Sequence, residues 1–294
     1  MLFILMWDHL FMGRNLMIMA AGMSSRMKRS AETDGISIKS KEALIKPKMM
    51  LNIGSSKRPF LDYLLVNAKN AGYKNILFIV NDRDSTVLDY YINNQDDDYF
   101  QGLIFSFAKQ IIPQGRSKPL GTADAVITGL RSKPEWSGQK FTVCNSDNLY
   151  STNALESLRN DKNLSALIDY DRDSLGVEPE RVKAFAVIWK NKDGFLTDIV
   201  EKPDQVQVEK ATDKKGRIGV SMNIFRLDYD TIFPLLTETP INPKRDEKEL
   251  TETIRMLVEK YKNSVFSLPF SEPVPDLTTI KDIEDVEAFI SSKT

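Results

Sequence analysis

The chain has 294 residues, of which 41% are hydrophobic and 28% are charged, and its formal net charge is −1. This length and balance fit one large α/β domain or two modest ones. The near-zero charge gives no global attraction for nucleic acid or for an anionic membrane surface, so we expect neither as a partner.

The chain contains one histidine, His9, and one cysteine, Cys144. This scarcity excludes an internal disulfide, a cysteine-rich zinc site and a Ser-His-Asp triad. Cys144 lies in an apolar run and is expected to be a core residue. Chemistry must therefore depend on carboxylates, lysines, arginines and backbone amides, which are the groups that phosphoryl and nucleotidyl transfer use.

Residues 1–15 are predicted to be an N-terminal extension. Met1–Met12 is apolar but contains Asp8 and His9 and lacks a basic leader and a cleavage site, so a mis-assigned start codon or a peripheral strand or helix explains it better than a signal peptide. Neither this segment nor any later run is long enough to span a bilayer. We expect a cytoplasmic protein.

From residue 16 onward, short apolar runs alternate with amphipathic stretches, a pattern typical of a mainly parallel sheet covered by helices. The predicted strands lie at 16–20, 76–80, 103–107, 141–145, 164–169, 184–189, 196–200, 220–225 and 265–268. Helices are predicted over 60–71 and 122–130, after Asp246 in a capping box with Glu249, and after a cap at Thr279. The polar segment 29–43 is predicted to be a mobile loop, and residues 16–294 a single domain.

The first motif follows the predicted strand Leu16–Ala20, where a turn of small residues, Ala21-Gly22-Met23-Ser24-Ser25, leads to Arg26. Backbone amides in such a turn approach phosphate oxygens closely, and the arginine can pair with them. A plain tight turn has the same pattern.

A second motif, Pro47-Lys48, places a lysine before an apolar segment, where its point charge suits a phosphate. A solvated lysine is the alternative.

A third motif runs from Gly115 to Gly121-Thr122-Ala123, where proline and glycine shape a loop whose backbone can read a planar base. Asp147 follows the strand predicted at 141–145, where ligands gather in open α/β sheets, and its carboxylate suits Mg²⁺. An Asx-turn is the alternative for Asp147.

The last motif, Glu201-Lys202-Pro203, ends another predicted strand. The acid can accept hydrogen bonds from sugar hydroxyls, and the lysine can hold a phosphate. A surface ion pair is the alternative.

Taken in order, Ala-Ala-Gly-x-x-Ser-Arg-Met, Pro-Lys, Pro-Leu-Gly-Thr-Ala, Ser-Asp-Asn and Val-Glu-Lys-Pro resemble the sugar-phosphate nucleotidyltransferases, also called NDP-sugar pyrophosphorylases, from about Leu16 to Glu252. The resemblance implies a GT-A-like, Rossmann-like three-layer α/β/α sandwich with a mixed, mainly parallel sheet and a sugar-binding half from about residue 150. It also implies a Mg²⁺-dependent enzyme that joins a nucleoside triphosphate to a sugar 1-phosphate by direct in-line attack and releases pyrophosphate.

The resemblance assigns a role to each motif residue. The implied catalytic residues are Arg26, Lys48 and Asp147. Those implied to bind the nucleotide are Ala21, Gly22, Ser25, Arg26, Gln114, Gly121 and Thr122. Those implied to bind the sugar phosphate are Asn148, Ala186, Glu201, Lys202 and Asn223. The implied Mg²⁺ ligands are Asp147 and Glu252.

The chain departs from the family pattern at several positions. Ser24 and Ala186 stand where the family usually has glycine, the span from Arg26 to Lys48 is longer than usual, and Gln114 lies farther from the Pro-Leu-Gly motif than the base-reading glutamine does. Leu250-Thr251 leads to Glu252 where the family has aspartate, and a glutamate near a helix start is also favoured by the helix dipole.

Two alternatives stay open from the sequence. The turn Ser24-Ser25-Arg26-Met27 also suits a cytidylyltransferase acting on a non-sugar phosphate such as phosphocholine. A catalytically silent regulatory subunit with the same fold is the alternative of another class, although Lys48 and Asp147 are both present. The base, the sugar, and the choice between a monomer and a homo-oligomer also stay open.

Overall fold

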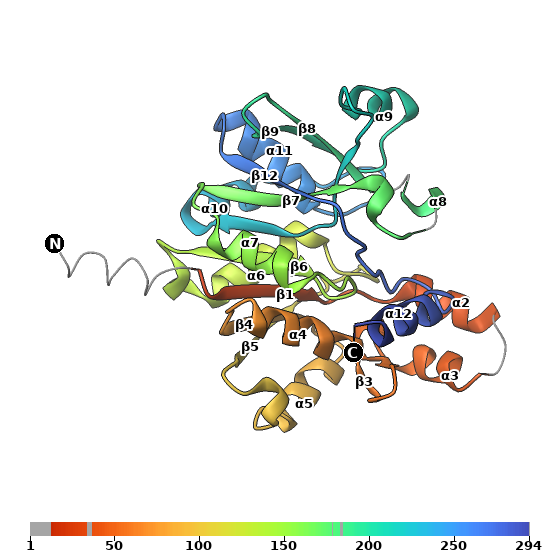
Figure 1. Cartoon of the computed structure of the whole chain (residues 1–294). Coiled ribbons are helices and arrows are strands. Elements are labelled where there is room, and N and C mark those ends of the chain that lie inside the picture. The colour runs from red at the N-terminus through yellow and green to blue at the C-terminus, as the bar shows by residue number, and fades with distance from the viewer. Residues whose placement is uncertain (1–12, 34–36, 178, 183–184, 294) are drawn as a thin grey trace.

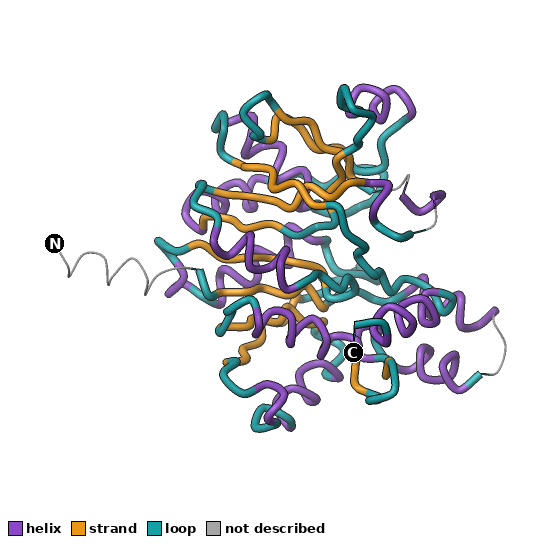
Figure 2. The backbone as a smooth tube through the Cα atoms, viewed as in Figure 1, coloured by secondary structure: helices purple, strands orange, loops and turns teal. Residues whose placement is uncertain are grey.

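A ten-stranded mixed sheet organises the protein, and helices cover both of its faces (Figures 1 and 2). The structure is a computed structural model that describes residues 13–33, 37–177, 179–182 and 185–293. Most of the predicted N-terminal extension, including His9, therefore lies outside the described residues. No helix in the described ranges has both the length and the apolar character needed to cross a membrane.

The order of the strands places the earliest part of the chain in the centre of the sheet. The order is β5 (Ile104–Gln110), β4 (Asn75–Asn81), β1 (Asn15–Ala20), β6 (Lys140–Asn145), β11 (Phe225–Asp228), β7 (Ser165–Asp171), β10 (Gly219–Ser221), β8 (Ala186–Lys190) and β9 (Leu196–Val200), and β12 (Val265–Phe270) also pairs with β7. Only β9, β10 and β11 run against the direction of the other strands. The mixed, mainly parallel sheet is thus confirmed.

Side chains alternate along β1 between two separate cores. Leu16 and Ile18 belong to the core on one face, and Met17 and Met19 belong to the core on the other. Because both faces of β1 are buried, the strand is apolar throughout, as is typical of a central parallel strand.

Each core is closed by its own helices. The first is covered by α2 (Ser25–Thr33), α3 (Ile38–Ile45), α4 (Phe60–Asn70), α5 (Thr86–Asn93), α7 (Thr152–Asn160) and α12 (Asp282–Ser291). The second is covered by α6 (Thr122–Ser132), α10 (Tyr229–Glu238) and α11 (Leu250–Lys260). The short elements are η1 (Lys48–Met50), β2 (Asn52–Ile53), β3 (Arg58–Pro59), η2 (Asp98–Phe100), η3 (Pro134–Trp136), η4 (Arg172–Ser174), α8 (Pro179–Val182) and α9 (Gln205–Ala211). The three-layer α/β/α sandwich is confirmed.

The predicted strand at 220–225 is interrupted in the structure. Strands β10 and β11 both pair antiparallel with β7, but Asn223 between them has φ of 55°, which breaks the strand. The predicted strand at 184–189 begins at Ala186, and residues 183–184 lie outside the described ranges. The other predicted strands are present within a few residues of their predicted ends.

The predicted mobile loop at 29–43 is wrong for the described residues, because most of them form α2 and α3. Met27, Ala31 and Ala43 are buried in the core. The Ser30 hydroxyl accepts from the Ile280 amide at 3.0 Å, which ties the segment to the chain just before α12. The polar residues therefore form the outer face of packed helices.

The two predicted helix caps are also wrong. Helix α11 has Glu249 as its N-cap, while Asp246 has φ of 54° and pairs with Arg116 at 2.8 Å. Helix α12 begins at Asp282, whose carboxylate accepts from the Thr279 amide at 2.5 Å. Asp282 therefore holds the turn that Thr279 was expected to cap.

Candidate active site

Two cavities open beside the end of β6 and share a wall. We call them the glycine-loop cavity, of about 340 Å³, and the charged cavity, of about 430 Å³. Thr122, Asn145, Asp147 and Glu247 line both. The predicted residues Ala21, Gly22, Ser25, Lys48 and Gly121 line the glycine-loop cavity. The predicted residues Arg26, Asn148, Ala186, Glu201, Lys202 and Asn223 line the charged cavity.

The turn after β1 is held to its two neighbouring strands. The Ser146 hydroxyl, beyond the end of β6, donates to the Met19 carbonyl at 2.8 Å, and the Asn81 amide, at the end of β4, donates to the Ala21 carbonyl at 3.3 Å. A Cβ added at Gly22 would meet no atom within 4 Å. Open space therefore faces Gly22. A loop that admits phosphate oxygens needs such space.

Lys48 lines the glycine-loop cavity and forms an ion pair with Asp147, which lines both cavities. Its side chain is 11% exposed, and its backbone is part of the short helix η1. Lys48 is therefore not the solvated lysine of the alternative reading. Its ammonium therefore faces Asp147 on the wall that the two cavities share.

Asp276 lies beside Asp147 because two chain segments pair at this point. The Leu277 amide donates to the Asp147 carbonyl at 2.9 Å, and the Leu149 amide donates to the Pro275 carbonyl at 2.9 Å. The pKa of the Asp276 carboxyl is raised, first by burial and then by the negative charge of Asp147, whereas Lys48 and Arg181 act in the opposite direction. Two adjacent carboxylates that repel each other form a donor set suited to a divalent cation.

Glu252, the predicted second Mg²⁺ ligand, lines neither cavity. Its carboxylate pairs with Arg255 at 3.0 Å on the same helix. The structure therefore gives no support to Glu252 as a partner of Asp147. No group of three or more acidic, cysteine or histidine side chains suited to a metal occurs within the described ranges.

Gln114 likewise lines neither cavity, whereas Gln110, at the end of β5, lines the glycine-loop cavity. The Gln110 amide donates to the Gly121 carbonyl at 2.9 Å and to Asp124 at 2.8 Å. Gly121 has φ of 111°, and a Cβ there would lie 2.9 Å from the Lys248 amide nitrogen. Gly121 is therefore required by packing against the segment before α11, as well as lining the cavity.

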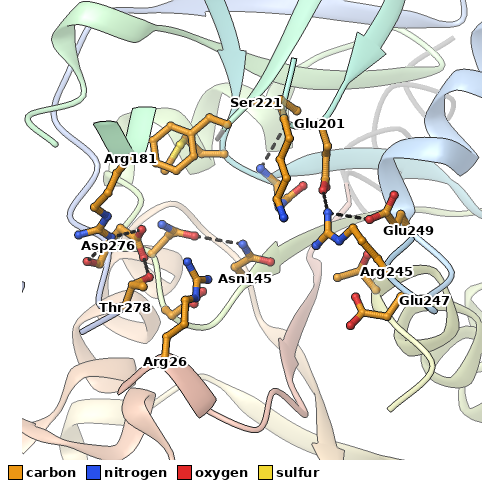
Figure 3. A pocket seen from close by; sticks show the side chains of 18 residues that line it. Arg26, Asn145, Arg181, Glu201, Ser221, Arg245, Glu247, Glu249, Asp276 and Thr278 are labelled. Atoms are coloured by element: carbon orange, nitrogen blue, oxygen red, sulfur yellow. Dashed lines mark hydrogen bonds and ion pairs between the residues drawn. The ribbon is translucent and has the colours of Figure 1, made fainter. Parts of the chain in front are cut away.

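Charged groups lie on two sides of the charged cavity (Figure 3). On one side Arg245 pairs with Glu201, and with Glu249 at 2.6 Å, while the Thr251 hydroxyl donates to Glu201 at 3.2 Å. Burial lowers the pKa of the Arg245 guanidinium, but the two carboxylates outweigh this effect and raise it. On the other side Arg181 pairs with Asp276 at 2.5 Å and also with Asp282.

The break in the strand at Asn223 places polar groups at the floor of the charged cavity. Ser221, Met222 and Asn223 all line it, and Ser221 pairs in register with Ala186 of β8. Lys202 follows β9 with φ of 49° and makes no ion pair with any described carboxylate. Lys202 and Arg26 are therefore cations available to an anionic ligand.

Among the residues of the charged cavity that the sequence analysis missed are Arg181, Arg245 and Asp276. Asp147 closely follows a predicted strand, whereas Asp276 lies well beyond the end of the strand predicted at 265–268 and lacks that signal. Arg245 and Arg181 lie in polar segments without such a signal. Only the tertiary fold brings them to the cavity.

A mainly parallel α/β sandwich with a small-residue turn, a lysine and two aspartates at one edge of the sheet is an arrangement suited to nucleotidyl transfer. A family model described as nucleotidyl transferase matches residues 43–293. The chain therefore belongs to the nucleotidyl transferase family, as the motifs predicted, and is an enzyme of the nucleotidyltransferase type. The turn at 21–26 lies ahead of the matched range.

The fold is similar to that of a UDP-glucose pyrophosphorylase solved in complex with UDP-glucose. The TM-score is 0.68 over 96% of this chain and 100% of that chain, with 20% sequence identity. The comparison with curated proteins finds no matching sequence.

Proposed function

We propose that the protein joins a nucleoside triphosphate to a sugar 1-phosphate, giving an NDP-sugar and pyrophosphate. The observation that carries this proposal is the pair of cavities that meet at Asp147. One cavity is built from the glycine loop and the other from polar and charged side chains. Two substrates bound in them would bring their phosphates together beside Lys48 and Asp147.

In the proposed reaction, an oxygen of the sugar 1-phosphate attacks the α-phosphorus of the triphosphate. The bond from the α-phosphorus to the bridging oxygen of the β-phosphate breaks, and pyrophosphate leaves with the electron pair. The acceptor phosphate is largely ionised at neutral pH, so no side chain has to remove a proton. Lys48 and Arg26 would stabilise the charge that spreads over the transferring group.

The residues around the charged cavity fit the acceptor half of this reaction. Lys202 and Arg245 supply positive charge for the acceptor phosphate, and Ser221 and Asn223 supply hydrogen bonds for sugar hydroxyls. Glu201 is held by Arg245 and Thr251, so its carboxylate is fixed in one position. A fixed carboxylate at a cavity wall is suited to select among sugar hydroxyl patterns.

Mg²⁺ is the cofactor we propose, with Asp147 and Asp276 as its protein ligands in place of the predicted pair Asp147 and Glu252. Mg²⁺ takes one or two carboxylates together with substrate phosphates, which matches this donor set. When bound, the ion would neutralise charge on the phosphates.

The phosphocholine alternative is less well supported by the charged cavity. A quaternary ammonium group is recognised by several aromatic faces around it. Among the described residues that line this cavity, Phe185 is the only aromatic one. The silent-subunit alternative is not favoured either, because Lys48, Asp147 and Asp276 are all present and adjacent.

Pyrophosphate release from a matrix of nucleoside triphosphates and acceptors tests the proposal. We expect pyrophosphate to be released only when one triphosphate, a sugar 1-phosphate and Mg²⁺ are all present. EDTA should abolish this release. Release with phosphocholine but with no sugar 1-phosphate would establish the alternative acceptor class. If the folded protein releases no pyrophosphate with any combination of triphosphate and acceptor, the proposed activity is overturned.

A further inference from the structure

Ser24 combines an unfavourable backbone with a buried hydroxyl contact. It has φ of 53° and is 8% exposed. Positive φ is uncommon for every residue except glycine, because the Cβ atom crowds the backbone. A glycine would fit this conformation more easily, so the serine side chain must contribute something that glycine lacks.

The Ser24 hydroxyl accepts a hydrogen bond from the Lys48 backbone amide at 3.0 Å, and this contact is buried. Lys48 is the first residue of η1, and Pro47 before it provides no side-chain cap. The first amides of a helix have no partner within the helix. Ser24 therefore satisfies a buried donor that would otherwise be unpaired.

Ser24 does not use its hydroxyl as a helix-capping serine does. Its carbonyl accepts from the Lys28 amide at 3.0 Å, so it stands at the N-terminus of α2. A capping serine has an extended backbone and bonds to an amide of its own helix. Here the hydroxyl instead joins the turn after β1 to a segment 24 residues later in the chain.

This contact lies at the root of the Lys48 side chain, whose ammonium pairs with Asp147 at the other end. A change in the orientation of the Lys48 backbone would move the ammonium along the shared wall of the two cavities. We propose that Ser24 is a positioning residue, which holds the Lys48 backbone so that the ammonium faces Asp147 and the transferring phosphoryl group. The catalytic part of this inference rests on the proposed function.

Amide hydrogen exchange of Lys48, measured by NMR on the whole chain without substrates, tests the contact itself. Ser24→Gly and Ser24→Ala should each raise the exchange rate of the Lys48 amide at least about tenfold, the effect of losing one hydrogen bond. The Met50 amide, which donates to the Pro47 carbonyl, is the internal reference and should change much less. Unchanged exchange at Lys48 in both variants would overturn the proposal.

Lys57→Gly is the matched control. Lys57 also has a positive φ, of 50°, but it is exposed and lines neither cavity. Both glycine variants relieve the same kind of backbone strain and loosen the unfolded chain alike. Ser24→Gly also loses the hydrogen bond to the buried Lys48 amide, so its melting temperature should fall relative to that of Lys57→Gly. A lower turnover in Ser24→Gly alone reports on the hydroxyl.

We expect kcat to fall about tenfold in Ser24→Gly and in Ser24→Ala, with a smaller change in the KM for the triphosphate, while Lys57→Gly keeps normal kinetics. If kcat of Ser24→Gly equals that of the unaltered protein, the proposal is contradicted. If the unaltered protein releases no pyrophosphate but Lys48 exchange responds as expected, the proposed function fails while the Ser24–Lys48 contact stands.

Discussion

Asp147 and Asp276, 129 residues apart in the chain, lie close together because the segments around them pair through an antiparallel bridge between Asn148 and Asp276. Asp147 follows β6, and Asp276 follows β12, which pairs with β7. Lys48 and Arg181 each neutralise one of the two carboxylates. Both aspartates thus line the charged cavity, and Asp147 also lines the glycine-loop cavity.

The first prediction concerns Asp276→Asn, which should weaken Mg²⁺ binding and lower Mg²⁺-dependent turnover at least about a hundredfold, or about 2.7 kcal/mol. Without metal, the same change should raise the melting temperature at neutral pH, because it removes a charge that is disfavoured first by burial and then by Asp147. The measurements are Mg²⁺ titration of pyrophosphate release and thermal unfolding in EDTA. Glu252→Gln is the matched control and should leave the Mg²⁺ requirement unchanged.

The raised pKa of Asp276 gives this prediction a pH dependence. The folded state holds the Asp276 proton more tightly than the unfolded state does, so its contribution to stability is present at low pH. That contribution is lost as the pH rises from the ordinary carboxyl pKa of 3.8 through the higher folded value. In EDTA, Asp276→Asn should therefore lose less stability than the unaltered protein over this range. Equal losses in both proteins would argue against a raised pKa of Asp276 in the folded state.

The second prediction is that Lys48→Ala lowers turnover at least about a hundredfold. The loss of the ammonium also leaves Asp147 unpaired beside Asp276, so the melting temperature in EDTA should fall slightly and be recovered with Mg²⁺. Lys39→Ala, which removes an ion pair with Glu287 at 2.5 Å, is the control and should keep normal turnover. Near-normal pyrophosphate release from folded Lys48→Ala protein would remove Lys48 from the reaction.

The third prediction separates the two substrates. Arg245→Ala should raise the KM for the acceptor about ten- to a hundredfold, in line with losing hydrogen bonds to a charged group, while the KM for the triphosphate changes little. Arg255→Ala is the control on α11, because Arg255 pairs with Asp198 and Glu252 and lines neither cavity. Equal effects of Arg245→Ala on both KM values would place Arg245 outside the acceptor subsite.

The central strands and Asp147 could be predicted from the sequence because each depends on a short, continuous stretch of the chain. The apolar run at 16–20 and the carboxylate after the run at 141–145 are features of single segments. The structure of 29–43 was missed because its helices bury few and mostly small side chains, among them Ala31 and Ala43. In such a polar segment, so few and such small apolar residues do not distinguish a packed helix from a loop.

The second carboxylate was missed for a different reason. Glu252 was chosen by its place in a motif, but the fold directs it toward Arg255. Asp276 reaches Asp147 through backbone pairing between segments that are distant in sequence. Contacts of this kind depend on the packing of β12 beside β7, which no local pattern in the chain specifies.

The last prediction compares two glycines of the glycine-loop cavity. A Cβ at Gly22 would enter open space, so Gly22→Ala should leave the melting temperature within about a degree or two of normal. The added methyl group would still occupy the space that phosphate oxygens need, so the KM for the triphosphate should rise.

Gly121→Ala should behave in the opposite way. Its φ of 111° is unfavourable for alanine, and the new Cβ would collide with the Lys248 backbone. Together these effects should lower the free energy of unfolding by about 2–4 kcal/mol. Thermal unfolding and triphosphate saturation curves for the two variants are the measurements. If Gly22→Ala binds the triphosphate normally, then Gly22 does not lie against the phosphates, and the turn after β1 serves only to connect the strand to α2.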